Sequence, residues 1–350
     1  MTRAARGYEV LYLEEPVHQA VPRPELSLHR DPSGVVVATP VLPDDARDPA
    51  VSIRTLIDRL IGSRGDLVAW YYTPMALAFS EHLAPSVTVY DCMDELSAFL
   101  DPPPDLAGFE TRLFARADVV FTGGRSLFEA KRRRHRDVFL FPSSIDAAHF
   151  GRSREGLPDP ADQAGIPHPR IGFFGVIDER MDRELVLRAA RACPEVHFVM
   201  LGPVVKIDPA GLPRAENLHW LGAKDYADLP VYLANWDAGW MPFALNESTR
   251  FISPTKTPEF LSAGLRLVST PIPDVVRDYG ADGLVTILNK DDDLPTTLRA
   301  SLEPAPAGWL RRVDAQLAGR SWDRTWSDMA RIVERHRHAA PLLARRQKGP

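Results

Sequence analysis

Two ionisable side chains stand three positions apart in the stretch "ISPTKTPEFLSAGLRLVST", residues 252–270. Ser253 suits a helix N-cap and Pro254 suits the first helical position, while Gly264 is typical of a residue just past a helix end. We therefore expect a helix that begins at Ser253 and ends near Gly264. Lys256 then falls in the first turn, where the partial positive charge of the helix terminus disfavours a cation.

A bound anion would account for this lysine. In open parallel sheets, ligands bind beyond the carboxyl ends of the strands and against helix N-termini. Glu259 lies on the same helix face as Lys256, so a phosphate could contact the lysine while sugar hydroxyls contact the carboxylate. The alternative is an ordinary surface pair, worth about a few tenths of a kcal/mol, and spacing alone slightly favours that alternative.

A second pair of acidic residues lies in "VYDCMDEL", where Asp91 and Asp94 come at the end of an apolar run. A carboxylate here could act as general base toward an acceptor hydroxyl, and we select Asp94 for that role. Helix N-capping is the alternative, and we expect it for one of the two. His18 could line the same acceptor side, although a solvated loop histidine is the simpler interpretation.

Four further residues could contact a donor molecule. Gly175 and Gly202 end apolar runs, where glycine lets backbone approach a diphosphate, although a plain turn is nearly as plausible. Tyr226 could line a pocket for a nucleotide base, with a half-buried structural tyrosine as the alternative. Asn246 could reach a donor sugar, or it could simply cap a helix or a turn.

Two charge runs suggest other sites. The run "KRRRHR" at 131–136 is expected on a helix as a solvated face, although it could also attract anionic lipid headgroups. The run "DDD" at 291–293 could hold Mg²⁺ with nucleotide phosphates. Because it lies just before a helical stretch, a turn and a helix cap are the favoured interpretation.

The elements that must position these residues form an alternating series. Short apolar runs alternate with helical stretches along the chain, which predicts parallel sheets with right-handed crossovers and two doubly wound α/β domains. The expected strands are 8–15, 34–40, 66–72, 86–92, 117–123, 137–142, 170–175, 196–202, 217–222, 237–243, 265–270 and 283–288.

The expected boundaries follow from composition. Residues 1–150 form a first domain, the Pro- and Gly-rich segment 151–169 a linker, and residues 170–320 a second domain. Residues 321–350 form a last helix, which packs back toward the first domain, and a tail. The first strand follows "MTRAARG" almost at once, so either the first domain lacks its opening βα unit or the start of the chain is misassigned.

Composition limits the class of protein. The chain has 350 residues, is 45% hydrophobic and 25% charged, and carries a formal net charge of -5. This balance argues against nucleic-acid binding through bulk charge. No stretch approaches the length of a membrane span and no signal peptide is visible. Two distant cysteines, Cys92 and Cys193, lack metal-ligand spacing, which indicates a reduced cytoplasmic protein.

Several segments together resemble the donor half of GT-B-fold glycosyltransferases. They resemble most closely the bacterial surface-polysaccharide group similar to teichuronic-acid glycosyltransferases of the family 4 type. The matching segments are "IGFFGVIDERMD", "FVMLGPV", "HWLGAKDYADLPVYLANWDAGWMPF", "NESTRFISPTK" and "TPEFLSAGLRLVST". A weaker resemblance covers "YDCMDELSAF" and "FPSSIDAAHF" in the first half.

The resemblance implies transfer of a sugar from a nucleoside-diphosphate sugar, with uridine as the expected base, to a glycan or polyprenyl-linked acceptor. Lys256 would contact the diphosphate and Glu259 the ribose, and no cofactor or metal ion is expected. Gly222, Ser253 and Thr255 complete the candidate donor set. A lipid-linked acceptor would place the protein in the cytoplasm, with peripheral contact at the inner membrane face.

The sequence departs from the family pattern at several positions. Arg180 matches an expected arginine, but Leu185 stands where a lysine is common. Phe251 replaces the first of two glutamates eight residues apart, so that only Glu259 remains. Ser143-Ser144 replaces an Asn-Gly pair before the hinge aspartate. These departures leave the donor sugar and the stereochemistry of transfer open.

Two other classes of function are compatible with the sequence. A sugar-nucleotide epimerase can share this architecture, although no clear pair of acid and base groups is visible. A non-catalytic nucleotide-sugar-binding partner in polysaccharide assembly would be compatible with an incomplete first domain. A dinucleotide-dependent dehydrogenase is disfavoured because no G-x-G-x-x-G follows an early strand.

Overall fold

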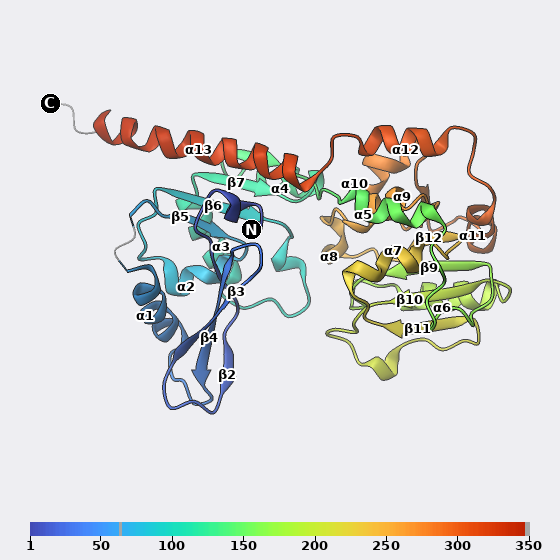
Figure 1. The fold of residues 1–350 in the computed structure, drawn as a ribbon, viewed down its shortest axis with the longest axis horizontal. Coiled ribbons are helices and arrows are strands. Elements are labelled where there is room, and N and C mark those ends of the chain that lie inside the picture. Colours follow the sequence, from blue (N-terminus) through green and yellow to red (C-terminus); the bar gives the residue numbers. More distant parts are fainter. Residues whose placement is uncertain (63–64, 347–350) are drawn as a thin grey trace.

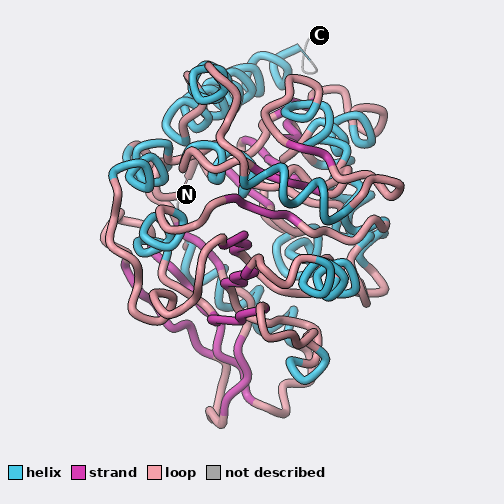
Figure 2. Tube along the Cα trace, turned by 90° about the vertical axis from the view of Figure 1, so that its right-hand side faces the viewer, coloured by secondary structure: helices cyan, strands magenta, loops and turns pink. Residues whose placement is uncertain are grey.

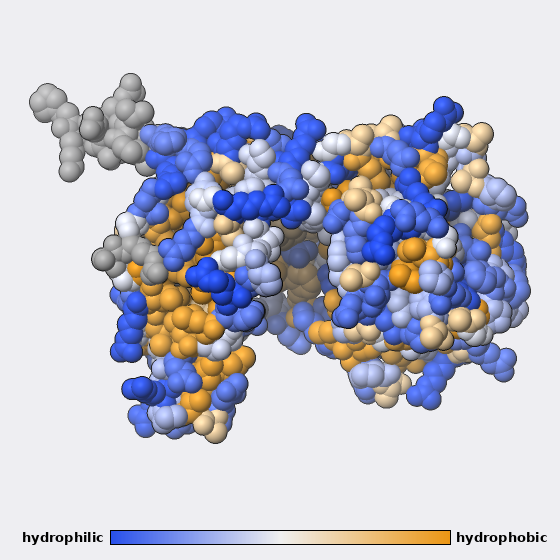
Figure 3. All heavy atoms as spheres, in the orientation of Figure 1, coloured by the Kyte–Doolittle hydropathy of each residue, from blue (hydrophilic) through white to orange (hydrophobic). Residues whose placement is uncertain are grey.

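The structure is a computed structural model that describes residues 1–62 and 65–346. The chain forms two lobes, one from its first part and one from its middle part (Figure 1). The last helix, α13 (Trp322–Arg346), leaves the second lobe and lies across the first. The space-filling view shows the molecule hollowed between the two lobes (Figure 3).

The second lobe contains one six-stranded sheet in which every ladder is parallel. The strand order is β11-β10-β9-β12-β13-β14. The chain starts at the central strand β9, adds β10 and β11 on one side, and then adds β12 to β14 on the other side, as in doubly wound folds. The strands are β9 (Arg170–Phe174), β10 (His197–Leu201), β11 (Leu218–Gly222), β12 (Ala238–Met241), β13 (Leu267–Ser269) and β14 (Thr286–Ile287).

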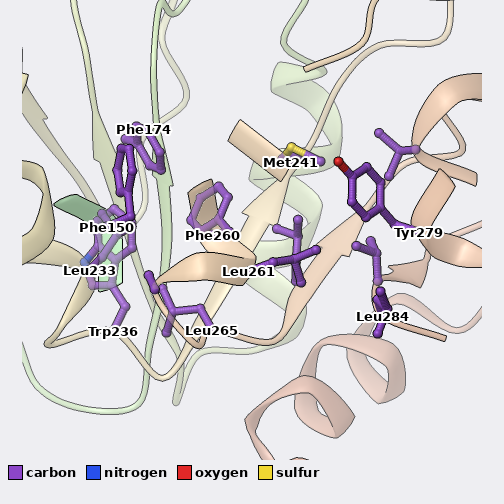
Figure 4. Close-up of a cluster of buried hydrophobic side chains, with 14 of the residues drawn as sticks. Phe150, Phe174, Leu233, Trp236, Met241, Phe260, Leu261, Leu265, Tyr279 and Leu284 are labelled. Atoms are coloured by element: carbon purple, nitrogen blue, oxygen red, sulfur yellow. The ribbon is translucent and has the colours of Figure 1, made fainter. Parts of the chain in front are cut away.

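Helices cover both faces of this sheet, which is why its strands are continuously apolar. On one face lie α6 (Arg183–Ala192) and α11 (Leu294–Leu302), which pack with Phe198 and Trp240. On the other face lie α7 (Leu229–Leu233), α9 (Lys256–Ser262) and α12 (Trp309–Leu317). Figure 4 shows Phe260 and Leu261 of α9 inside this second core.

Half of the first lobe is also a parallel sheet with both faces covered. Its order is β5-β6-β7-β8, and α3 (Leu106–Arg116) and α4 (Arg125–Lys131) pack on one face while α13 packs on the other. The strands are β5 (Val68–Tyr71), β6 (Val87–Cys92), β7 (Val119–Thr122) and β8 (Val138–Leu140).

The remainder of the first lobe differs from the predicted doubly wound sheet. A separate sheet contains β1 (Leu11–Leu13), β2 (Val17–Gln19), β3 (Glu25–Arg30) and β4 (Val36–Pro43), and β3 runs antiparallel to β4. Within the described residues, no ladder joins β1 to β5. The hairpin forms because Asp31 accepts a hydrogen bond from the Ser33 amide and Gly34 takes a φ of +94°. Figure 2 shows these strands projecting from the body.

Before β5, α1 (Pro49–Ile61) begins at an N-cap in which Asp48 accepts a hydrogen bond from the Val51 amide. The short α2 (Leu77–Ser80) follows β5 and contacts α1.

Residues 151–169 do not form the connection between the lobes that their composition suggested. Phe150 and Ile166 are buried in a core of the second lobe, and Arg154 pairs with Asp314 at 2.9 Å. The helix α5 (Ala147–Gly151) likewise packs on α9. The chain therefore crosses between the lobes before α5, and its prolines shape a segment that is folded onto the second lobe.

One contact between the lobes completes a helix. The first turn of α4 has Gly124 at its N-cap, which offers no side chain to the exposed amides. Asp274, from α10 (Pro273–Val275) of the second lobe, accepts hydrogen bonds from the Ser126 amide (2.9 Å) and hydroxyl (2.5 Å). A Cβ at Gly124 would lie 2.5 Å from Asp274 Oδ2, so only glycine permits this approach.

Candidate functional site

Three glycines meet at the carboxyl ends of neighbouring strands, and two of them, Gly175 and Gly202, were expected at strand ends. Gly175, Gly202 and Gly222 follow or end β9, β10 and β11 with φ values of 132°, 145° and 72°. A Cβ on Gly175 would lie 1.8 Å from Lys256 Cε, and one on Gly202 would lie 1.8 Å from the Gly175 carbonyl oxygen. Glycine is therefore needed here for close packing, because it makes room for the lysine side chain over the β9 loop.

The helix that carries Lys256 begins later than predicted. α9 starts at Lys256 itself, with Thr255 at the N-cap position and no capping bond from its side chain. The prediction of Ser253 as N-cap is wrong. Ser253 packs against Gly124 of the first lobe, so closely that a Cβ added to Gly124 would lie 2.7 Å from the Ser253 Cβ. Gly264, with a φ of +84°, follows the helix end as expected.

The ammonium group of Lys256 has no hydrogen bond or ion pair with any residue in the described ranges. Desolvation lowers its pKa below the usual value, the nearby Glu259 opposes that change, and the Arg180 charge adds to it. A desolvated cation without a partner is costly unless a ligand supplies the opposite charge.

Glu259 is a second ionisable group without a direct partner. Across residues 1–62 and 65–346, its carboxylate takes part in no hydrogen bond or ion pair. Burial raises its pKa to about 7, and Lys256 limits the rise. The opposite face of α9 is fixed in the core through Thr257, Phe260 and Leu261, so Lys256 and Glu259 are held on the face away from it.

Arg180 lies beside these two groups but is already engaged. Its guanidinium contacts Asp178 through Nε (3.0 Å) and Nη2 (2.6 Å). It also lies 5.4 Å from the ring centre of Phe99 in the first lobe. Leu185 is buried in a second-lobe core, so the position where the family resemblance expects a lysine supplies no charge.

Asp94 faces the second lobe from the end of β6. Burial raises the pKa of its carboxyl, and the Arg180 charge partly opposes this rise. No residue that the structure describes donates a hydrogen bond to that carboxylate. Asp91, in contrast, lies inside β6, where it accepts a 3.0 Å bond from Trp70 Nε1. Neither aspartate caps a helix, contrary to the expectation for one of them.

Tyr226 lies in the second lobe with a partner that sequence analysis missed. The residue is 52% exposed, and its ring stacks on His149 at 4.3 Å between ring centres. His149 Nε2 is 2.8 Å from the Tyr226 carbonyl oxygen, which fixes the pair. Burial raises the pKa of Tyr226, and the charge of Glu259 raises it further. The stacked pair therefore lies near the Glu259 carboxylate. In the sequence, His149 could have been placed only as a residue in the first turn of a helix capped by Asp146, whose carboxylate accepts a hydrogen bond from the His149 amide.

Asn246 caps a helix, which was the alternative to the expectation that it reaches a donor sugar. Its side-chain oxygen accepts a hydrogen bond from the Thr249 amide at the start of α8 (Glu247–Arg250). The Ser248 hydroxyl also donates to it, at 2.6 Å. Phe251, at the end of that segment, packs against a core of the first lobe.

Sequence analysis also missed a cluster across the hollow between the lobes. Both carboxylate oxygens of Glu179 are buried without a hydrogen-bond partner, and Lys206 lies 3.8 Å from one of them. The Lys206 ammonium lies 5.1 Å from the ring centre of Phe99, on which Arg180 also stacks. Phe99 therefore contacts two cations of the opposite lobe.

The charge runs have structural roles. Asp293 caps α11 by accepting from the Thr296 amide, which confirms the turn-and-cap interpretation of "DDD". Among the described residues, no group of three or more His, Cys, Asp or Glu side chains could hold a metal ion. His18 is exposed in β2.

The run 131–136 lies beyond the expected helix, because α4 ends at Lys131; its four arginines are exposed, whereas Lys131 is not. Lys131 is buried and paired with Glu95 and Glu110, and Arg134 also pairs with Glu110. Arg136 pairs with Asp137 at 2.7 Å. Among the helices of the described segments, none combines the length and apolar character that a bilayer span requires.

Comparisons with known proteins agree with this arrangement. No protein-family model matches the chain. It is 24% identical over 224 residues to a protein described as a candidate teichuronic acid biosynthesis glycosyltransferase, TuaH, of Bacillus subtilis strain 168. That match covers 59% of this chain and 56% of the relative, so the chain spans about half the length of the curated relative it matches.

Similar solved structures cover nearly the whole chain. A UDP-forming trehalose-phosphate synthase of Burkholderia xenovorans, bound to glucose-6-phosphate, has a TM-score of 0.69 at 13% identity, with 95% of each chain covered. WaaG, a glycosyltransferase of lipopolysaccharide biosynthesis, has a TM-score of 0.61 at 13% identity, covering 95% of this chain and 93% of its own. The chain therefore has the GT-B fold, with two α/β lobes facing one another.

Proposed function

We propose that the protein is a glycosyltransferase that takes a sugar from a UDP-linked donor and passes it to a glycan or lipid-linked acceptor of surface polysaccharide synthesis. The observation that carries the proposal is Lys256. It is a desolvated cation without a partner in the described ranges, and it lies over the glycine loop after the central strand β9. An anionic ligand at this place would neutralise the lysine, and it would lie where open parallel sheets usually bind ligands, beyond the carboxyl ends of the strands.

The proposed donor lies along the second lobe. Lys256 holds the diphosphate, and the close-packed loops at Gly175 and Gly202 let the backbone approach it. Glu259 accepts hydrogen bonds from ribose hydroxyls. The exposed ring of Tyr226, supported from behind by His149, provides a flat surface for the base.

The proposed acceptor lies along the first lobe. Asp94 acts as general base and takes the proton from the attacking hydroxyl, a role that a raised pKa favours. Lys256 stabilises the charge that develops on the departing diphosphate, while Arg180, whose charge acts on Asp94, stays paired with Asp178.

The substrate classes draw on the relatives. One similar protein is named for teichuronic acid biosynthesis and another for lipopolysaccharide biosynthesis, and a third is named UDP-forming. These names favour a uridine donor and a cell-envelope acceptor. Work in the cytoplasm, with peripheral contact at the inner membrane face, fits such an acceptor, and the exposed arginines of the run 131–136 are available for that contact.

Titration calorimetry with UDP, ADP and GDP tests the donor site. We expect saturable binding of UDP, at a Kd of about 1 mM or lower, that is lost in Lys256→Ala. Absence of binding by all three diphosphates at millimolar concentration would overturn the proposal. Incubation of UDP-sugars without acceptor separates the epimerase alternative, because an epimerase would convert the donor sugar by itself.

A further inference from the structure

A balanced cluster of four charges lies beneath the loop that carries Asp94. The side chain of Lys131, at the end of α4, is only 3% exposed. Its ammonium lies 2.7 Å from Glu95 Oε2 and 2.7 Å from Glu110 Oε1, and Arg134 completes the cluster by pairing with Glu110. Two cations thus meet two carboxylates, with Lys131 in the interior of the first lobe and Arg134 at its surface.

Lys131 and Glu110 remain ionised at neutral pH. Burial alone would lower the pKa of Lys131, but its bonds to Glu110 and Glu95 outweigh burial and raise that pKa. Burial would raise the pKa of Glu110, but Lys131 and Arg134 hold it below its usual value. The contacts between Lys131 and its two carboxylates are therefore charge-assisted and strongly directional.

Such a cluster is a poor way to stabilise a fold. Apolar residues of similar volume stabilise an interior at least as well as a buried ion pair does, because charges lose their hydration. Its geometry matters more than its net energy. Of the two carboxylates, Glu110 belongs to helix α3, which the core already holds, whereas Glu95 belongs to the loop after β6.

Backbone contacts hold the near side of that loop. The Gly123 amide donates to the Cys92 carbonyl oxygen at 3.1 Å, and a Cβ on Gly123 would lie 2.8 Å from the Met93 carbonyl oxygen. The far side begins at Glu95, directly after Asp94, and its side-chain link to the body of the lobe is Lys131. Asp94 therefore lies between a backbone clamp and a charged tether.

We propose that Lys131 is a positioning residue which, through Glu95, holds Asp94 at the correct place for proton transfer from the acceptor. The inference rests on the proposed function for the role of Asp94. A displacement of about 1 Å in a reacting group can cost about a hundredfold in rate, so loss of the tether should reduce turnover while donor binding is unchanged.

The test uses Glu95→Ala, which cuts the tether and leaves Lys131 paired with Glu110. Lys131→Met removes the tether from the other side. Arg134→Met is the matched control, because it removes a cation of the same cluster and keeps the bond between Lys131 and Glu95. Each variant is measured for kcat, for KM of the acceptor and for Kd of UDP, and by hydrogen exchange of residues 92–99.

We expect Glu95→Ala to lower kcat about tenfold to a hundredfold, to leave the Kd of UDP within about twofold, and to speed amide exchange in residues 92–99. Arg134→Met should keep kcat within about threefold and leave exchange there unchanged. A Glu95→Ala variant with normal kcat, or with normal exchange in this loop, overturns the inference.

The two proposals fail separately. Wild-type protein that binds no nucleotide and transfers no sugar refutes the proposed function. The exchange measurement still decides whether Lys131 and Glu95 fix the loop, because it needs no turnover. Normal exchange in Glu95→Ala would then refute the positioning role by itself.

Discussion

Two lysines, one in each lobe, are largely removed from water, and their surroundings could hardly differ more. Lys131 has two carboxylates at 2.7 Å, and its pKa is raised. Lys256 has no hydrogen bond or ion pair within the described residues, and desolvation lowers its pKa. One charge is satisfied by the fold, and the other has no counter-charge there, which is the basis for proposing that a ligand supplies it.

The comparison gives a physical criterion for telling a charge that stabilises the fold from a charge that is proposed to bind a ligand, and the criterion needs no homologous protein. A buried ion that stabilises a fold is paired, because an unpaired ion destabilises it. An ion that binds a ligand must tolerate being unpaired when the ligand is absent, so its site is rigid and somewhat unstable by itself. Glu259, close to Lys256 and equally without a partner, extends the same pattern to a carboxylate.

Removal of the paired lysine should have the largest effect. Lys131→Met leaves Glu95 and part of the charge of Glu110 without compensation, and we expect the free energy of unfolding to fall by about 3–5 kcal/mol. Urea denaturation followed by circular dichroism measures this loss. A loss below about 1 kcal/mol would show that the cluster relaxes easily and would remove the basis of the comparison.

The unpaired lysine should behave in the opposite way. Lys256→Met should leave the unfolding free energy of the ligand-free protein unchanged or raise it, because it removes a desolvated cation from the first turn of α9. UDP binding should weaken by about 1.5–3 kcal/mol, the range for a hydrogen bond to a charged group. Calorimetry and denaturation of the same variant check both. Lower stability with normal affinity would make Lys256 structural.

Glu259 should give stability a pH dependence. Its pKa in the folded protein is raised to about 7 from an ordinary value of 4.5. The folded state therefore binds this proton more tightly, and its contribution to stability declines as the pH rises between those two values. In Glu259→Gln, the fall in unfolding free energy with rising pH should be smaller by about 1–2 kcal/mol than in the wild-type protein. Denaturation at pH 5 and pH 8 for both proteins measures the difference, and an identical pH dependence in the two would contradict a half-buried, unpaired carboxylate.

The smallest expected effect concerns the sugar of the nucleotide. If Glu259 accepts a bond from ribose, wild-type protein should prefer UDP over its 2′-deoxy analogue, and Glu259→Gln should reduce that preference by about 0.5–1.5 kcal/mol. Competitive calorimetry with the two nucleotides gives the difference. An unchanged preference in the variant would place Glu259 away from the ribose.

Much of the second lobe was predictable from sequence because its strands are buried on both faces. The runs 170–175 and 196–202 correspond to β9 and β10, and the glycine that ends each run allows the close packing at Lys256. The start of α9 was misplaced, because Ser253 is drawn into a contact with the first lobe that local sequence does not encode.

The first lobe was less predictable, and so were the partners that come from distant segments. The strand β3 is mostly exposed and polar, so it lacks the apolar run by which the other strands were found. His149 reaches Tyr226 only because α5 folds onto the second lobe. Lys131 belongs to a basic run that suggested a solvated face, and only the burial of α4 against α3 shows its true role.

The contact of Asp274 with Ser126 has a consequence for how the two lobes melt. The first turn of α4 obtains its cap from the opposite lobe, and Lys131 lies at the other end of the same short helix. Separation of the lobes would expose unsatisfied amides at one end of α4 and loosen the buried charges at the other. Heat or denaturant should therefore unfold the two lobes in a single cooperative transition, and residues 1–146 alone should form α4 poorly.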